Sequence, residues 1–349
     1  MSIPAPTGES NAADNQQIAI EESMRRNMEK LRFELGPVIC NALDDPKVTE
    51  IMVNPPDGRI FLDRLVTGME DTGENIPEPK LLAGIGTIAA ILKTEVNNKY
   101  PLLKGELPIG GARIQATISP ASKTSGITIR KHARMVFPLN QYVEEKRLTE
   151  EGFIFLRESL RSRKNILIVG GTGSGKTTFA NSLLAMLKEI CPMDRIVMLE
   201  DTYELQCKMR NHYSLCTVEG VTEEDKIDMQ MLVETSLRMR PDRIVVGEVR
   251  NGAALDLLKS WNTGHPGGIC TIHANSAEGA LSRLELLILE VSVGSMKALI
   301  GEAINIIVFL KKIAKIGPVV TEIMVLNEFN NQTGEYEYDY FQKSEEFGF

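Results

Sequence analysis

The sequence predicts an α/β fold in two parts. A chain of 349 residues is too long for one ordinary hydrophobic core, which favours two domains. In the second half, short apolar segments alternate with helical stretches, a pattern typical of a largely parallel sheet with helices on both faces. The first half mixes helices with short alternating strands and predicts a smaller α+β domain. We therefore expect a disordered tail over 1–16, an N-terminal α+β domain over 17–134, a linker over 135–149 and an α/β domain over 150–349.

The N-terminal elements follow from composition and spacing. Residues 1–16 are mostly small and polar, which is typical of disorder. A helix is expected over 17–43, where Met24, Met28, Leu31 and Leu35 fall near one face, and Pro46 follows its end. The other elements of this half are expected as strands at 49–54 and 59–63, a helix at 78–97, and strands at 112–118 and 125–131.

The C-terminal elements begin with a helix start. Thr149 offers a capping hydroxyl, and Glu150 and Glu151 place acids at the positive end of the helix dipole. Buried strands are expected at 166–169, 195–199, 243–247, 268–272 and 304–310, with helices at 178–187, 224–239 and 253–261. The segments 321–329 and 335–341 flank a polar turn with glycine and predict a hairpin.

A glycine-rich segment joins the first of these strands to its helix. Residues 170–177 read G-G-T-G-S-G-K-T, the spacing of a P-loop in the strand–helix context that the motif requires. Backbone N–H groups and a helix N-terminus favour phosphate there, with Lys176 at the β- and γ-phosphates and Thr177 at Mg²⁺. A plain glycine turn or a dinucleotide fingerprint would not need the Lys-Thr pair. The expected ligands are ATP and Mg²⁺, and the expected nucleotide-binding residues are Gly171, Thr172, Gly173, Ser174, Gly175, Lys176, Thr177 and Thr178.

Acidic residues follow the next two strands. Strand ends of an open α/β sheet face the ligand crevice, so Glu200, Asp201 and Glu204 could hold hydrated Mg²⁺ and orient water. A solvated acidic turn is the alternative. Glu248 follows the third strand, after Gly247 where a Walker B motif usually has Asp. A carboxylate there can hold a magnesium-bound water or polarise the attacking one. The expected metal ligands are Thr177, Glu248 and Asp201.

Histidines and arginines complete the candidate set. His273 lies immediately beyond the fourth strand, where it could sense a γ-phosphate, and His265 is a second candidate; a structural histidine is the alternative for both. Zinc is not expected, because the chain has only four histidines and no acid or cysteine stands at ligand spacing with these two. Arg238 and Arg240 are expected to pair with the acidic loop, to face a neighbouring subunit, or to be ordinary surface arginines.

Composition excludes several classes of protein. Hydrophobic residues make up 43%, charged residues 25%, and the net charge is −8, which fits a soluble globular protein and argues against direct nucleic-acid binding. No apolar run reaches the roughly 18 residues that a transmembrane helix needs, and residues 1–15 do not read as a signal peptide. The five cysteines are dispersed, as expected of reduced cytoplasmic thiols.

Together these segments resemble the secretion ATPases. The P-loop, the acidic segment 199–205, the segment 238–250 and the segment 263–275 match in order and spacing the Walker A, Asp, Walker B and His boxes of that superfamily. Glycine in place of the Walker B Asp is a substitution the superfamily shares. Within it, the chain most resembles the VirB11-type ATPases of type IV secretion, and among them the TrbB conjugal-transfer proteins, over about residues 25–330. The tetracysteine zinc module of type II secretion ATPases is absent, which argues against that branch.

The resemblance implies a RecA-like C-terminal domain and a homohexameric ring at the cytoplasmic face of the inner membrane. Inner-membrane components of a type IV secretion apparatus are the implied partners. It also implies that N-terminal arginines contact the nucleotide phosphates, and the matching positions are Arg113 and Arg130; from the residues alone, each could equally face solvent. The expected catalytic set is Lys176, Glu248, Glu200, Glu204, His273, Arg113 and Arg130.

The expected function is hydrolysis of ATP to energise assembly of, or substrate transfer through, a conjugative type IV secretion system. A pilus-type motor ATPase, an ATP-dependent scaffold with little turnover, and a DNA motor are the alternatives; the acidic net charge counts against the last. Peripheral membrane contact stays open, because Arg25, Arg26, Lys30 and Arg32 lie beside apolar residues in the 17–43 helix. A solvated helix packed on the N-terminal domain is the other interpretation.

Overall fold

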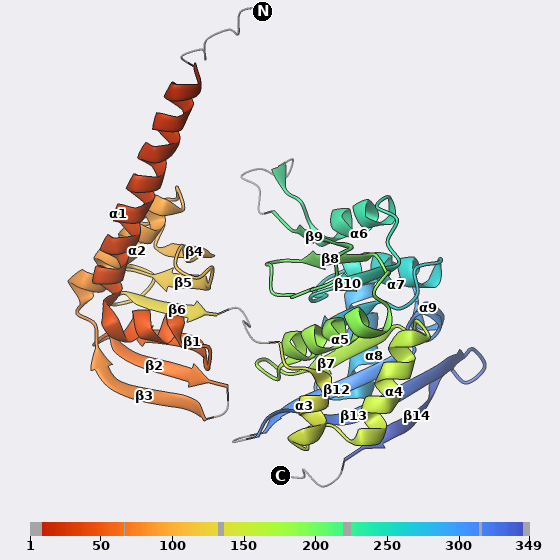
Figure 1. The fold of residues 1–349 in the computed structure, drawn as a ribbon. Helices are drawn as coiled ribbons and strands as arrows, with labels where there is room; N and C mark the ends of the chain where they lie inside the picture. The colour runs from red at the N-terminus through yellow and green to blue at the C-terminus, as the bar shows by residue number, and fades with distance from the viewer. Residues whose placement is uncertain (1–8, 66, 132–135, 219–224, 314–315, 345–349) are drawn as a thin grey trace, which may run out of the picture. The chain divides into compact units, whose positions relative to one another are not determined.

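The protein is seen in a computed structural model that describes residues 9–65, 67–131, 136–218, 225–313 and 316–344. It divides into two compact units, residues 1–134 and 135–349, and each is described by itself (Figure 1). Within the described residues, no helix combines the length and the apolar character that crossing a membrane would require.

The N-terminal unit is an antiparallel sheet with two helices, as the α+β prediction required. Its strand order is β3-β2-β1-β6-β5-β4. Leu35 of α1, Ile85 of α2 and Ile51 of the sheet are at most 2% exposed, so one core joins both helices to the sheet. The elements are α1 (Glu9–Asp44), β1 (Val48–Asn54), β2 (Arg59–Arg64), β3 (Gly68–Asn75), α2 (Glu78–Ile91), β4 (Leu102–Glu106), β5 (Arg113–Thr117) and β6 (Gly126–Arg130).

Two features of this unit differ from the expectations. Helix α1 already begins at Glu9, so the expected disordered tail is wrong for 9–16, while residues 1–8 lie outside the described residues. The helix is broken at Gly36, whose φ of 80° suits glycine, and at Pro37, which has no N–H to donate. Strands β3 and β4 were not predicted, because most of their side chains are exposed and leave little apolar alternation to read.

The C-terminal unit contains the predicted, largely parallel sheet. Its strand order is β14-β13-β12-β7-β11-β10-β8-β9, parallel from β12 to β9 and antiparallel from β12 to β14. The predicted terminal hairpin is β13–β14. The strands are β7 (Ile166–Gly170), β8 (Ile196–Glu200), β9 (His212–Cys216), β10 (Arg243–Val246), β11 (Ile269–Ile272), β12 (Ile306–Ile313), β13 (Gly317–Asn330) and β14 (Glu335–Lys343).

Helices cover both faces of this sheet, which confirms the layered α/β prediction (Figure 1). On β7, Ile166 and Ile168 pack into one core with α3, α4 and α5, whereas Leu167 and Val169 pack into a second core with α6 to α9. Thr149 caps α4 by accepting a hydrogen bond from Gly152 N at 3.0 Å. The helices are α3 (Leu139–Glu144), α4 (Glu150–Arg161), α5 (Lys176–Ile190), α6 (Met229–Leu237), α7 (Ala253–Asn262), α8 (Ala277–Leu289) and α9 (Lys297–Ala303).

The expected linker over 135–149 is instead part of the second unit, apart from residue 135, which lies outside the described residues. Leu139 and Tyr142 of α3 are buried, and the Tyr142 ring packs edge-on against Phe179 of α5 at 5.4 Å. The linker was predicted from Pro138 and the charged run after it. That prediction did not take into account that Leu139 and Tyr142 share one helical face. Strand β9 was also missed, because it is a partly exposed edge strand.

Candidate nucleotide site

The P-loop connects the buried strand β7 to α5. Gly175 stands at the helix N-cap with φ of 88°, and a Cβ there would lie 2.4 Å from Pro318 Cγ, so the position requires glycine. Side chains at Gly171 or Gly173 would meet nothing within 4 Å, so this backbone lines open space. Ser174 Oγ is buried and has no hydrogen-bond partner in the described part of the chain. An open loop of N–H groups at a helix N-terminus fits a phosphate chain.

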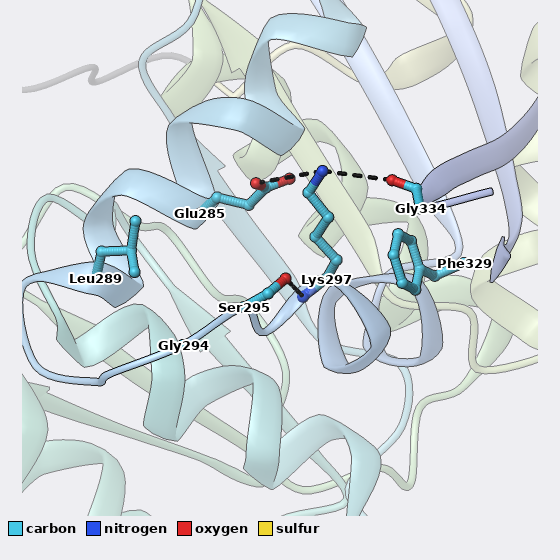
Figure 2. A pocket seen from close by; sticks show the side chains of 7 residues that line it. All are labelled: Glu285, Leu289, Gly294, Ser295, Lys297, Phe329 and Gly334. Carbon is cyan, nitrogen blue, oxygen red and sulfur yellow. Dashed lines mark hydrogen bonds and ion pairs between the residues drawn. The ribbon is translucent and has the colours of Figure 1, made fainter. Parts of the chain in front are cut away.

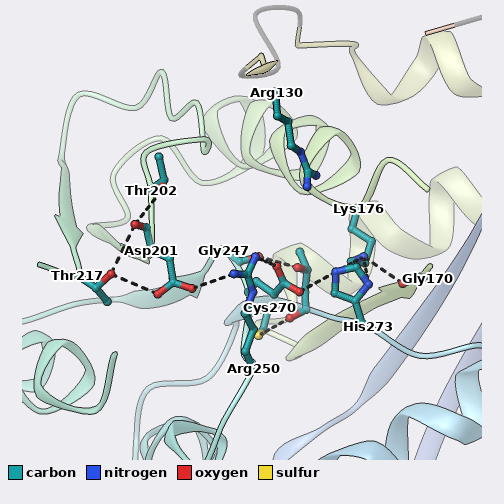
Figure 3. Close-up of polar contacts among 12 residues, drawn as sticks. Arg130, Gly170, Lys176, Asp201, Thr202, Thr217, Gly247, Arg250, Cys270 and His273 are labelled. Carbon is teal, nitrogen blue, oxygen red and sulfur yellow. Dashed lines mark hydrogen bonds and ion pairs between the residues drawn. The ribbon is translucent and has the colours of Figure 1, made fainter. Parts of the chain in front are cut away.

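Lys176 is held at the mouth of this loop by neutral acceptors. Its side chain is buried, and Nζ donates hydrogen bonds to Gly170 O at 3.0 Å and Gly171 O at 3.1 Å. The same nitrogen lies 3.2 Å from Nδ1 of His273 (Figure 3). A phosphate oxygen is a stronger partner for an ammonium than these groups. Lys176 is therefore placed to exchange them for a nucleotide.

Sheet register brings His273 to this point and keeps His265 away from it. Strand β11 runs parallel to β7 with Ile272 opposite Val169, so the residue after β11 lies beside the start of the P-loop. His265 precedes β11 and therefore lies at the opposite edge of the sheet, where the P-loop is not. Of the two histidines, only His273 belongs to the candidate site.

Glu248 is the next member of the site. Its Oε1 lies 2.8 Å from Nε2 of His273, and its side chain is 17% exposed. Nζ of Lys176 lies at almost the same distance from the two ring nitrogens of His273, 3.2 Å from Nδ1 and 3.3 Å from Nε2. Burial raises the pKa of the Cys270 thiol, and the Glu248 charge raises it further. Cys270 is therefore a neutral packing residue near Glu248 rather than a nucleophile or a metal ligand.

The acidic residues of the segment 199–205 make different contacts. Glu200 is 2% exposed, and its Oε1 accepts hydrogen bonds from the backbone N–H groups of Glu204 and Leu205, both at 2.7 Å. A Cβ at position 247 would lie 3.2 Å from Glu200 Cγ, so Gly247 leaves room for this carboxylate. Through these contacts Glu200 holds the loop that follows β8 in place, and its expected part in metal binding and catalysis stays a prediction. The sequence shows that carboxylates are present in this segment, but not which of them accepts hydrogen bonds from backbone N–H groups.

Asn181 also holds the acidic loop and was not predicted. It is fully buried on α5, where its side chain donates to Glu204 O at 3.2 Å and accepts from Gln206 N at 2.7 Å. The acidic loop is thus tied directly to the P-loop helix. The sequence does hold one sign of this role: Asn181 is a single amide side chain among the apolar residues of the buried face of this helix.

Asp201 is an exposed carboxylate of the same segment. Asp201 Oδ1 accepts a hydrogen bond from Thr217 Oγ1 at 3.3 Å, and Oδ2 lies 3.7 Å from Nη1 of Arg250. Nη2 of Arg250 in turn donates to Glu248 Oε2 at 2.6 Å. Hydrogen bonding to Glu248 raises the pKa of Arg250, with Asp201 and Glu204 adding to the effect. In the sequence analysis, Arg250 is only the last residue of the segment 238–250, and no role is predicted for it.

The predicted metal ligands have oxygen atoms of the kind that Mg²⁺ binds, but they do not surround a metal position on their own. In the described segments, no three His, Cys, Asp or Glu side chains form a group that could hold a metal ion. Thr177 is partly exposed in the first turn of α5, and Glu248 and Asp201 are linked through Arg250. Magnesium keeps several waters and commonly takes few protein ligands beside substrate phosphates. A hydroxyl with one or two carboxylates fits that chemistry.

In the N-terminal unit, Arg113 and Arg130 stand opposite each other on β5 and β6. Neighbouring core positions such as Ile114 and Ile129 are buried, so the arginines occupy the outer face of the sheet. Arg130 Nε lies 3.9 Å from Oε1 of Glu50, its cross-strand neighbour on β1. Two adjacent guanidinium groups form a surface that favours anions.

Arg238 and Arg240 do not reach the acidic loop. They precede β10, whose Arg243 is paired with Ile196 at the start of β8, while the acidic loop follows the other end of β8. Nη1 of Arg238 donates to Glu234 O at 3.3 Å within α6. Pairing with the acidic loop, one of the three alternatives, is therefore wrong, and a subunit contact or ordinary surface arginines remain.

A cavity of about 510 Å³ lies elsewhere in the C-terminal unit, between α8, α9 and the β13–β14 turn. Figure 2 shows Lys297 pointing toward Glu285 and the Gly334 carbonyl across it, at 3.9 and 3.4 Å. None of the predicted site residues lines this cavity. The nucleotide site is thus not the hollow that Figure 2 shows.

Comparisons with known proteins agree on one family. The family described as "Type II/IV secretion system protein" matches residues 87–336. The conjugal transfer protein TrbB of Rhizobium radiobacter is 44% identical over 92% of this chain and 96% of its own. The type IV secretion system protein VirB11 of Bartonella quintana is 31% identical over 83% of this chain and 94% of its own.

A solved structure shows the same fold. The ATPase DotB of Legionella pneumophila aligns with a TM-score of 0.59 and 19% identity, over 84% of this chain and 79% of its own. At that identity the likeness concerns the fold alone.

Proposed function

This chain belongs to the type II/IV secretion system protein family, and we propose that it hydrolyses ATP to energise assembly of, or substrate transfer through, a conjugative type IV secretion apparatus. One observation carries the proposal: Lys176, His273 and Glu248 form a continuous series of contacts at the mouth of an open P-loop. The similarity to a relative named as a conjugal transfer protein supports the choice of process.

The chain's own residues account for the reaction. P-loop N–H groups bind the phosphates, and Lys176 leaves the Gly170 and Gly171 carbonyls for the β- and γ-phosphate oxygens. Thr177 and Glu248 would hold Mg²⁺, which offsets phosphate charge when bound. Glu248 orients the water that attacks the γ-phosphate in line, and His273 gains the γ-phosphate as a partner once Lys176 has moved. Arg113 and Arg130 contact the phosphates during turnover and stabilise the developing charge.

The proposed assembly is a homohexamer at the cytoplasmic face of the inner membrane, bound to inner-membrane components of the secretion apparatus. The relatives named as a conjugal transfer protein and as a type IV secretion system protein support a place in such an apparatus. Direct nucleic-acid binding is not part of the proposal, since the net charge is −8. Light scattering with ATP and Mg²⁺ tests the ring: a mass near six times 38.7 kDa supports it, and a monomer under every condition contradicts it.

A mating assay tests the process. Donor cells that lack this gene but keep the rest of the transfer system receive the wild-type gene, Lys176→Ala, or Lys188→Ala, an exposed lysine of the same helix. The proposal expects plasmid transfer with wild type and Lys188→Ala, and none with Lys176→Ala at equal protein level. Full transfer with Lys176→Ala contradicts it. A scaffold that binds ATP without turnover would support transfer while the purified protein releases no phosphate.

A further inference from the structure

Arg250 contacts two carboxylates of the candidate nucleotide site, Glu248 and Asp201. It donates to Glu248 Oε2 at 2.6 Å through one nitrogen. Through another nitrogen it faces Asp201 Oδ2 at 3.7 Å (Figure 3). The two carboxylates follow different strands, β10 and β8. Arg250 is therefore the point where the segment carrying Glu248 meets the acidic loop.

Backbone geometry explains why position 250 can do this. Val246 lies opposite Leu199 in the parallel β8–β10 pair, so Glu248 and Asp201 continue the same register beyond the strands. Residues 248 and 250 are two apart in the sequence, and the hydrogen bond between their side chains shows that both lie on the same side of the chain. The guanidinium fork can then meet one carboxylate with each arm.

The two oxygens of Glu248 have different partners. Oε1 faces His273 at 2.8 Å, and Oε2 accepts from Arg250. Without Arg250, one side of a largely buried carboxylate would lose its donor, and the side chain could rotate toward water. A misplacement of about 1 Å in a reacting group can cost on the order of 100-fold in rate.

We propose that Arg250 is a positioning residue that holds the Glu248 carboxylate toward His273 and couples it to Asp201 in the acidic loop. The inference rests on the proposed ATPase function. The competing account is an ordinary surface ion pair, because Arg250 is 53% exposed and such pairs contribute little on average. The two accounts predict different kinetics.

The experiment compares Arg250→Ala and Arg250→Lys with Arg161→Ala. Arg161 is a matched control, since it is 52% exposed and pairs with Glu158 on the surface of α4. Arg250→Ala is expected to lower kcat about 10- to 100-fold with KM for ATP changed less than threefold. Arg250→Lys should recover part of the loss, and Arg161→Ala should behave as wild type. Wild-type kcat in Arg250→Ala would overturn the inference.

Coupling to Asp201 is tested by a double-variant cycle. If Arg250 acts through both carboxylates, Asp201→Asn and Arg250→Ala lower kcat less in combination than the product of their separate effects. Independent effects that multiply would remove Asp201 from the inference.

A readout without turnover separates this inference from the proposed function. Arg250→Ala should speed amide hydrogen exchange in residues 200–205 several-fold relative to Arg161→Ala, with the rest of the sheet unchanged. A wild type that releases no phosphate would defeat the proposed function alone. Unchanged exchange in 200–205 would defeat the role of Arg250 whatever the turnover.

Discussion

Nζ of Lys176 lies 3.2 Å from Nδ1 of His273, so the lysine of the P-loop is in contact with the residue after β11. The contact joins two segments that are far apart in the sequence. It places the binding group and the group proposed to sense the γ-phosphate at one point of the sheet edge.

Lys176→Ala should abolish turnover. It removes a charge-assisted contact to the phosphates, and loss of one such group commonly costs on the order of 10²- to 10³-fold in kcat. Phosphate release at saturating ATP and Mg²⁺ measures the effect, with Lys188→Ala as the control on the same helix. Turnover like that of the wild type would remove the P-loop from the mechanism.

Glu200→Gln and Glu200→Ala should differ sharply. Glutamine keeps an oxygen that can accept from Glu204 N and Leu205 N, whereas alanine leaves both N–H groups without it. We expect alanine to lower the free energy of unfolding by about 2–4 kcal/mol and glutamine by less than about 1 kcal/mol. Urea unfolding measures the stability and phosphate release the activity. A stable but inactive Glu200→Gln protein would instead show that the charge of Glu200 is catalytic.

Arg113→Ala and Arg130→Ala should each lower kcat by at least about tenfold, as expected for arginines that stabilise transition-state charge. Stability should change by less than about 1 kcal/mol, because each change relieves like charge across the β5–β6 pair and the Arg130–Glu50 ion pair is exposed. Arg32 is a matched control, with 46% exposure against 47% for Arg130 and a surface partner in Asp44. Loss of activity with matching loss of folded protein would assign these arginines to structure only.

Glu278 should make the fold sensitive to acid. Hydrogen bonds from Tyr340 and Tyr338, both at 2.9 Å, lower the pKa of this carboxyl below its ordinary value. A depressed pKa contributes stability that is present above the unfolded-state pKa and is lost as pH falls through the folded-state value. The wild type should therefore lose more unfolding free energy than Glu278→Gln between about pH 6 and pH 3. Parallel pH profiles for the two proteins would contradict this assignment.

The sequence predicted the parts of the fold that carry strong local patterns. Apolar runs such as 166–169 and a capping Thr149 identify their elements without tertiary information. Edge strands β3 and β9 escaped prediction because solvent on one or both faces removes the apolar pattern. Helix α3 was hidden for another reason: its two buried residues adjoin a charged run, and only their packing against α5 shows that they are core.

The candidate site was predictable to the extent that motif residues lie at strand ends. His273 and Glu248 come together because β11 and β10 end at the edge where the P-loop begins. The contacts of Glu200 with the loop after β8 and the link formed by Arg250 depend on side-chain direction, which spacing does not encode. His265 was also not separable from His273 by spacing alone. The segment 263–275 spans β11, so its two histidines lie at opposite edges of the sheet.

Glu248 is proposed to orient the water that hydrolyses a nucleotide held by the P-loop. The most direct test is phosphate release by the purified wild type and Glu248→Gln at saturating ATP and Mg²⁺, with ATP affinity measured in parallel. We expect steady turnover in the wild type, and in Glu248→Gln a fall of about 100-fold or more with ATP affinity retained. Wild-type turnover in Glu248→Gln, or none in either protein, would contradict the account.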